Sequence, residues 1–158
     1  MTGAGLVAAA VALLQAQTPK PPVVTVAEPT AVRITPGGKA AARVTVTIAP
    51  GFHVQANPAS GPNLIPLWMD LHCQPPLRLG SPSYPPGKRH RLQGSDLELS
   101  VYDGTIEVGV PVEAAKDAAP HQITIQGSLR YQACDDRICL RPQTVAVRVP
   151  VRVTAPSP

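Results

Sequence analysis

Cys134 and Cys139 are the residues of this sequence with the clearest capacity for chemistry. They lie in the stretch YQACDDRICLRP, residues 131–142, separated by four residues. Two thiols this close can form a structural disulfide, ligate a metal ion, or exchange electrons with another protein. The first question is which of these uses the surrounding residues favour.

A disulfide that only pins the turn would add little stability. The chain-entropy relation gives about 2 kcal/mol for a closed loop of this size, near the bottom of the usual range. Asp135 and Asp136 would oppose a thiolate, whereas Arg137 and Arg141 would favour one, so the local charges cancel. A redox pair here would therefore act as a passive carrier for thioredoxin-like partners. Spacing alone leaves the staple and the redox pair equally open.

A metal site needs three or four donors, and the sequence offers no ready set. It contains no H-x-x-x-H and no C-x-x-C, and His72 beside Cys73 is the one adjacent pair. We therefore expect no metal and no cofactor. The histidines are scattered along the chain: His53, His72, His90 and His121.

The N-terminus indicates export. The first seventeen residues carry no charge, and GLVAAAVALL (5–14) is continuously apolar. This run is too short for a bilayer, which needs about 20 residues. It is typical of a signal peptide over 1–17, with cleavage near Ala16 or Gln17. We expect a periplasmic location, without stable membrane insertion after cleavage, where nearby cysteines pair.

The net charge of +4 is modest, and its densest patch is GKRHR at 87–91. No aromatic residue interleaves this run to stack bases, so we expect a solvated loop and no nucleic-acid partner.

Short alternating runs and many turn residues predict an all-β chain. Twenty prolines and twelve glycines disfavour a helical bundle. In residues 42–50, Val44, Val46 and Ile48 alternate with polar residues, as in a half-buried strand. About six to nine short strands suggest an immunoglobulin-like β-sandwich, with a barrel as the second choice. The other predicted strands are 64–73, 97–102, 104–114, 121–132 and 143–154.

We expect one domain over 28–154, after a Pro-rich lead at 18–27 and before a short tail at 155–158. Residues 134–140 then form a hairpin-like connection between the last two strands.

Several stretches resemble the N-terminal periplasmic domain of the disulfide reductase DsbD, from about residue 28 to 154. The resemblance implies an immunoglobulin-like sandwich that carries a cysteine pair in a turn and relays electrons. A thioredoxin-like domain or protein would be the donor, and periplasmic disulfide-bearing proteins the acceptors. The matching stretches are GFHVQANPASGPNLIPL (51–67), YP (84–85), VYDGTIEVGVPV (101–112) and YQACDDRICLRP.

The resemblance also implies roles for individual residues. Cys134 and Cys139 would be the redox pair, with Cys139 facing partners and Cys134 deeper. The supporting positions would be Tyr131, Gln132 and Pro142, which frame the pair, and Phe52 and His53, which place rings near it.

Three departures from the family change these expectations. Family members place one more residue between their cysteines. Their aromatic cap loop corresponds here to about 85–95, which has no aromatic ring, so Tyr84 or the Arg and His side chains would replace it. Family members also continue into a membrane domain and a thioredoxin-like domain beyond the equivalent of Pro158. We therefore expect the electrons to come from another protein.

The leading interpretation is thus a monomeric relay of the protein-disulfide reductase type, in which Cys73 is a buried free thiol. The alternative is a non-catalytic binding module for a thioredoxin-like or secreted partner, with a structural disulfide. A metallochaperone sandwich is the third interpretation.

Overall fold

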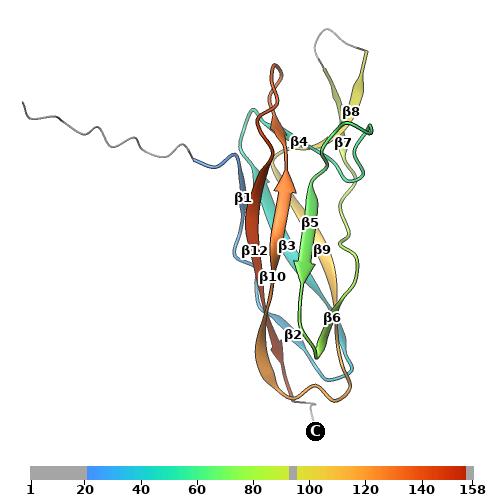
Figure 1. The fold of residues 1–158 in the computed structure, drawn as a ribbon, viewed down its shortest axis with the longest axis vertical. Coiled ribbons are helices and arrows are strands. Elements are labelled where there is room, and N and C mark those ends of the chain that lie inside the picture. The colour runs from blue at the N-terminus through green and yellow to red at the C-terminus, as the bar shows by residue number, and fades with distance from the viewer. Residues whose placement is uncertain (1–20, 93–95, 156–158) are drawn as a thin grey trace, which may run out of the picture.

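The computed structural model describes residues 21–92 and 96–155, and its regular structure in these ranges is entirely β (Figure 1). The predicted all-β class is therefore confirmed. The described residues contain no helix long and apolar enough to cross a membrane. The expected signal peptide at 1–17 and most of the expected tail lie outside the described residues.

The first sheet contains the strand with the clearest alternation. In β3, Val44, Val46 and Ile48 are buried while Arg43 and Thr47 are exposed, as predicted. Strand β1 lies within the expected Pro-rich lead and pairs antiparallel with β3, so the folded sheet begins before residue 28. In spatial order the strands are β1 (Val24–Val26), β3 (Lys39–Ile48), β9 (Thr105–Ala114) and β6 (Leu77–Leu79).

The second sheet is built around the longest antiparallel pair. Strands β10 and β12 pair over eleven residues each, from His121↔Val153 to Tyr131↔Gln143. Strand β2 joins β12 in parallel, and β5 joins β10 antiparallel. The spatial order is β2 (Val32–Ile34), β12 (Gln143–Val153), β10 (His121–Tyr131) and β5 (Trp68–His72).

These two four-stranded sheets contribute to one hydrophobic core, which gives the predicted β-sandwich rather than a barrel. Val44 and Val108 of the first sheet and Leu129 and Val149 of the second are fully buried in it. Burial of such side chains typically stabilises a fold by about 1.5–3 kcal/mol each.

A third, smaller sheet lies at one end of the molecule, where the β7–β8 hairpin and the connection between β10 and β12 both project (Figure 1). The segment 87–91 was expected to be a loop, and this expectation was wrong. Its residues Lys88–Arg91 form edge strand β7, because each pairs with a residue of β8. In spatial order the strands are β11 (Ala133–Cys134), β4 (His53–Gln55), β8 (Glu98–Tyr102) and β7 (Lys88–Arg91).

The described residues form twelve strands, more than the expected number. All six long strands were predicted. The additional ones have only two to four residues, too few to show an alternating pattern: β1, β2, β4, β6, β7 and β11.

Candidate functional site

Cys134 and Cys139 are joined by a disulfide at the end of the molecule that carries the third sheet. Their Sγ atoms lie 1.99 Å apart and their Cα atoms 3.9 Å apart. The two residues differ in accessibility: Cys134 is 5% exposed, whereas Cys139 is exposed. Cys73 is a free thiol on another part of the chain, immediately after β5.

The turn between the cysteines is held by hydrogen bonds of its own. Asp135 N donates to Ile138 O (3.0 Å), and Asp135 Oδ1 accepts from the amides of Arg137 (2.7 Å) and Ile138 (2.8 Å). These two amides lower the pKa of the Asp135 carboxyl, because they stabilise its ionised form. An Asp side chain that bonds the backbone two and three residues ahead is typical of a tight turn.

The base of the turn is closed by two further hydrogen bonds. Leu140 N donates to Ala133 O (2.8 Å), and the side chain of Gln132 donates from Nε2 to Leu140 O (3.0 Å). Gln132 therefore lies at the base of the turn that carries the pair. Pro142, the other end of the motif, is exposed.

A cavity of about 220 Å³ lies beside the disulfide. Both cysteines and the turn between them line it, together with four leucines from 64–99. Leu97 and Ile138 are large apolar side chains that are 52% and 60% exposed. Gln55 also lines the cavity, and its buried Oε1 has no hydrogen-bond partner among the described residues. The leucines are Leu64, Leu92, Leu97 and Leu99.

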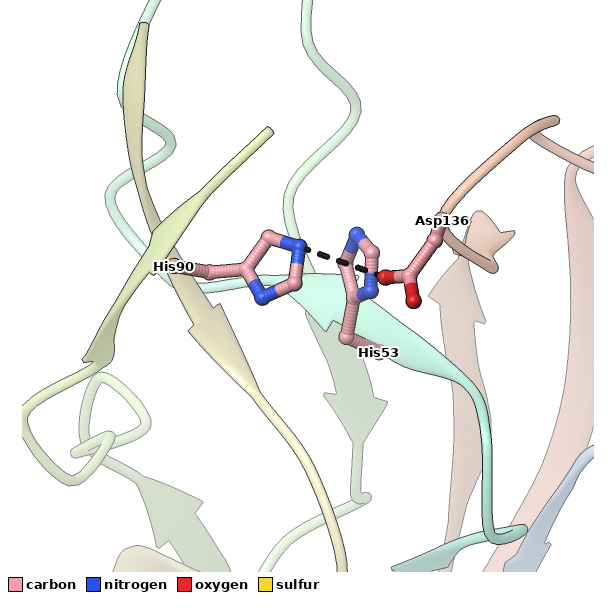
Figure 2. Close-up of side chains that lie close together, drawn as sticks. All are labelled: His53, His90 and Asp136. Atoms are coloured by element: carbon pink, nitrogen blue, oxygen red, sulfur yellow. Dashed lines mark ion pairs between the residues drawn. The ribbon is translucent and has the colours of Figure 1, made fainter. Parts of the chain in front are cut away.

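Three polar side chains from separate segments lie close together beside the cysteine turn, and two of them, His53 and Asp136, also line the cavity (Figure 2). His53 on β4 lies opposite Cys134 in the sheet register and is only 5% exposed. Its ring centroid is 4.3 Å from that of His90 on β7, with 36° between the ring planes. His90 Nε2 is 3.8 Å from Oδ1 of Asp136 in the cysteine turn.

Burial lowers the pKa of His53, and the neighbouring His90 lowers it further. Asp136, Asp135 and Asp103 act in the opposite direction without reversing the shift. This shift favours the neutral form of the His53 imidazole, in which one ring nitrogen carries no proton.

Tyr131 and Phe52, which were expected to frame the pair and to place a ring near it, do not line the cavity of the disulfide. Tyr131 is buried in the core because it continues the inward face of β10, and Phe52 packs at the core's edge. His53 takes the position beside Cys134 because β4 pairs with β11.

The expected replacement for an aromatic cap is only partly as predicted. Tyr84 is not at the cavity, since its hydroxyl accepts a hydrogen bond from Met69 N on β5 (2.8 Å). His90 does lie at the site, on the segment that corresponds to the cap. Leucines at the ends of the β7–β8 hairpin supply the apolar cover that sequence reasoning missed. The sequence signal for this cover was the apolar pattern of Leu92, Leu97 and Leu99.

Comparison with known proteins agrees with this architecture. Residues 14–150 match the family described as "Thiol:disulfide interchange protein DsbD, N-terminal". No curated protein matches the sequence.

Two solved structures are similar to this chain to different degrees. The first is the N-terminal periplasmic domain of ScsB from Proteus mirabilis, with a TM-score of 0.54 and 16% identity. The match covers 84% of this chain and 48% of that one, so the chain spans about half of its length. The other is PapD-like domain 7 of human CEP192, with a TM-score of 0.38, 11% identity and coverage of 94% and 98%.

Proposed function

Because the chain belongs to the family of N-terminal domains of the thiol:disulfide interchange protein DsbD, we propose that it is an electron carrier. The family connects it with thiol–disulfide exchange. The proposed carrier is exported to the periplasm and takes two electrons from a thioredoxin-like donor. It passes them to proteins with disulfides through Cys134 and Cys139.

The single observation that carries this proposal is the unequal exposure of the two cysteines. Cys139 is exposed and Cys134 is 5% exposed, so an incoming thiolate reaches one sulfur and leaves the other protected. Thiol–disulfide exchange requires such an accessible sulfur and a leaving sulfur. A purely structural disulfide has no need of an exposed end.

Each half-reaction balances through one mixed disulfide. A donor thiolate attacks Sγ of Cys139, the Cys134–Cys139 bond breaks, and Cys134 leaves as a thiolate that takes up a proton. The donor's second thiol then attacks its own sulfur in the mixed disulfide, which releases Cys139. The donor is oxidised to a disulfide and this domain is reduced to a dithiol. The same steps in reverse reduce the acceptor.

The surface around Cys139 is suited to a protein partner. Ile138 adjoins Cys139 and Leu97 lies across the same cavity, and both side chains are more than half exposed. Exposed apolar side chains of this size commonly mark contact sites. We propose that a thioredoxin-like protein covers both residues while its cysteine reaches Cys139.

A trapping experiment tests the division of labour between the cysteines. The probe is a thioredoxin whose resolving cysteine is serine and whose remaining cysteine carries thionitrobenzoate. Cys134→Ser leaves Cys139 as an exposed thiol, which should displace the coloured thionitrobenzoate rapidly and form a stable mixed disulfide. Cys139→Ser is the matched control. It should react at least about tenfold more slowly, because Cys134 is buried.

Both proteins carry Cys73→Ser, so no other thiol contributes. Equal rates for the two variants would contradict the proposed roles. If neither variant reacts while both remain folded, the alternative of a binding module with a structural disulfide is supported instead.

A further inference from the structure

We propose that His53, His90 and Asp136 form a binding site for a divalent transition-metal ion of the zinc type, which links strand β7 to the cysteine turn. This site goes beyond the proposed electron transfer, which needs no metal. Sequence reasoning treated the histidines as scattered, because 53, 90 and 136 are distant along the chain. Pairing of β4 with β8 and β11, and of β7 with β8, brings them together.

The geometry is close to that of a three-ligand site. One ligand atom from each residue lies within 4.8 Å of the others, and His90 Nε2 is 3.8 Å from Asp136 Oδ1. Donors around a tetrahedral zinc ion lie about 3.3 Å apart, given zinc–nitrogen distances of about 2.0–2.1 Å. The donor atoms need to move only slightly closer together to bind zinc. The side chain of Asp136 has room to move toward the histidines because it is 64% exposed.

The side chains do not satisfy one another well without an ion. The 3.8 Å separation of His90 Nε2 from Asp136 Oδ1 is too long for a hydrogen bond. The two imidazole rings lie 4.3 Å apart. A cation between the two imidazoles and the Asp136 carboxylate would give all three groups a common partner.

The donor set selects the kind of ion. Two imidazole nitrogens and one carboxylate oxygen suit zinc and its neighbours in the first transition row. Magnesium and calcium prefer sites made of oxygen donors. Three protein ligands leave one coordination position open, as in zinc sites that exchange a ligand.

Calorimetric titration with zinc chloride tests the site directly. The protein is the disulfide form carrying Cys73→Ser, with any purification tag removed, so no thiol and no foreign histidine can bind. We expect one zinc per chain at slightly alkaline pH and no binding of magnesium chloride. His90→Gln and Asp136→Asn should each weaken zinc binding by about tenfold or more.

His121→Gln is the matched control, since His121 is an exposed histidine outside the cluster. Its zinc affinity should equal that of the parent. His90 and Asp136 are on an edge strand and an exposed turn, so their variants should fold normally, which circular dichroism checks.

Hydrogen exchange supplies a second readout. Zinc should slow exchange of the β7 and β8 amides in the parent and leave it unchanged in His90→Gln, because the ion links β7 to the turn. The proposal is overturned if zinc does not bind, if both ligand variants retain the parent affinity, or if His121→Gln loses as much affinity as they do.

Discussion

Asp135 and Ile138 are joined by two hydrogen bonds that run in opposite directions across the cysteine turn. The amide of Asp135 donates to Ile138 O at 3.0 Å, and the amide of Ile138 donates to Asp135 Oδ1 at 2.8 Å. None of these atoms belongs to the disulfide. The chain itself therefore holds the turn closed and brings the two sulfurs together.

Loss of the Asp135 side chain should make the disulfide easier to reduce. Asp135→Ala removes the acceptor for two amides, so the reduced turn opens and the cysteines meet less often. The equilibrium constant for disulfide formation against glutathione should fall about two- to tenfold. Asp135→Asn is the matched control, since it keeps the acceptor oxygen and should remain near the parent value. An equal fall in both variants would mean that charge, not the hydrogen bonds, is responsible.

The domain should fold without its disulfide, as a carrier that visits both redox states requires. The bond closes a short loop, so its loss should cost only about 2 kcal/mol, against about 5–15 kcal/mol for a typical domain. Cys134→Ser/Cys139→Ser should keep its β-sheet circular dichroism, with a melting midpoint lower by roughly 5–10 °C. Unfolding of this variant at room temperature would favour a structural role for the disulfide.

Cys73 should be a slow-reacting thiol. It is partly buried and its Sγ donates to Leu77 O at 3.3 Å, and burial raises its pKa. Less thiolate is therefore present at neutral pH, so iodoacetamide should modify the folded, unreduced protein more slowly than the denatured protein. The rate should reach half its maximum at a pH above the usual thiol value of about 8.5. Denatured, unreduced protein should contain one free thiol, and a disulfide that includes Cys73 would contradict this assignment.

A methyl group at Gly127 should destabilise the sandwich. A Cβ built there would lie 2.0 Å from Asp70 O and 2.8 Å from Leu71 Cα, both backbone atoms of β5. Gly127→Ala must push β5 away from β10, at a cost of about 1–3 kcal/mol or more in the free energy of unfolding. Gly109→Ala is the matched mid-strand control, because its nearest neighbour would be 4.0 Å away. Urea denaturation of both variants measures the difference, and equal stabilities would contradict the close contact.

The longest strands were predictable because their alternation extends over many residues. Strand β3 alternates buried and exposed positions along most of its length, and β12 does so in the half that covers the core. Strand β4 has only three residues, all buried, so no period-two signal exists in it. Strand β7 reads as a charged run, and only its partner β8 makes it a strand.

The sequence predicted only the part of the site whose residues are close together along the chain. Cys134, Cys139 and Gln132 lie within one short motif, and their arrangement follows from one turn. The contact of His53 with His90 depends on the pairing of β8 with both β4 and β7, which no local pattern specifies. The burial of Tyr131 depends in the same way on which face of β10 meets the opposite sheet.

The eleven-residue ladder between β10 and β12 ends where the cysteine segment begins. Tyr131 and Gln143 are its last paired positions, so residues 132–142 connect two neighbouring strand ends, with Ala133 and Leu140 still packed in or against the core. An insertion or deletion inside that segment would alter the short β11–β4 pairing but leave every rung of the ladder in register. Residues 135–138, between the cysteines, should therefore tolerate a change in number, which makes the scaffold suitable for redox turns of different cysteine spacing.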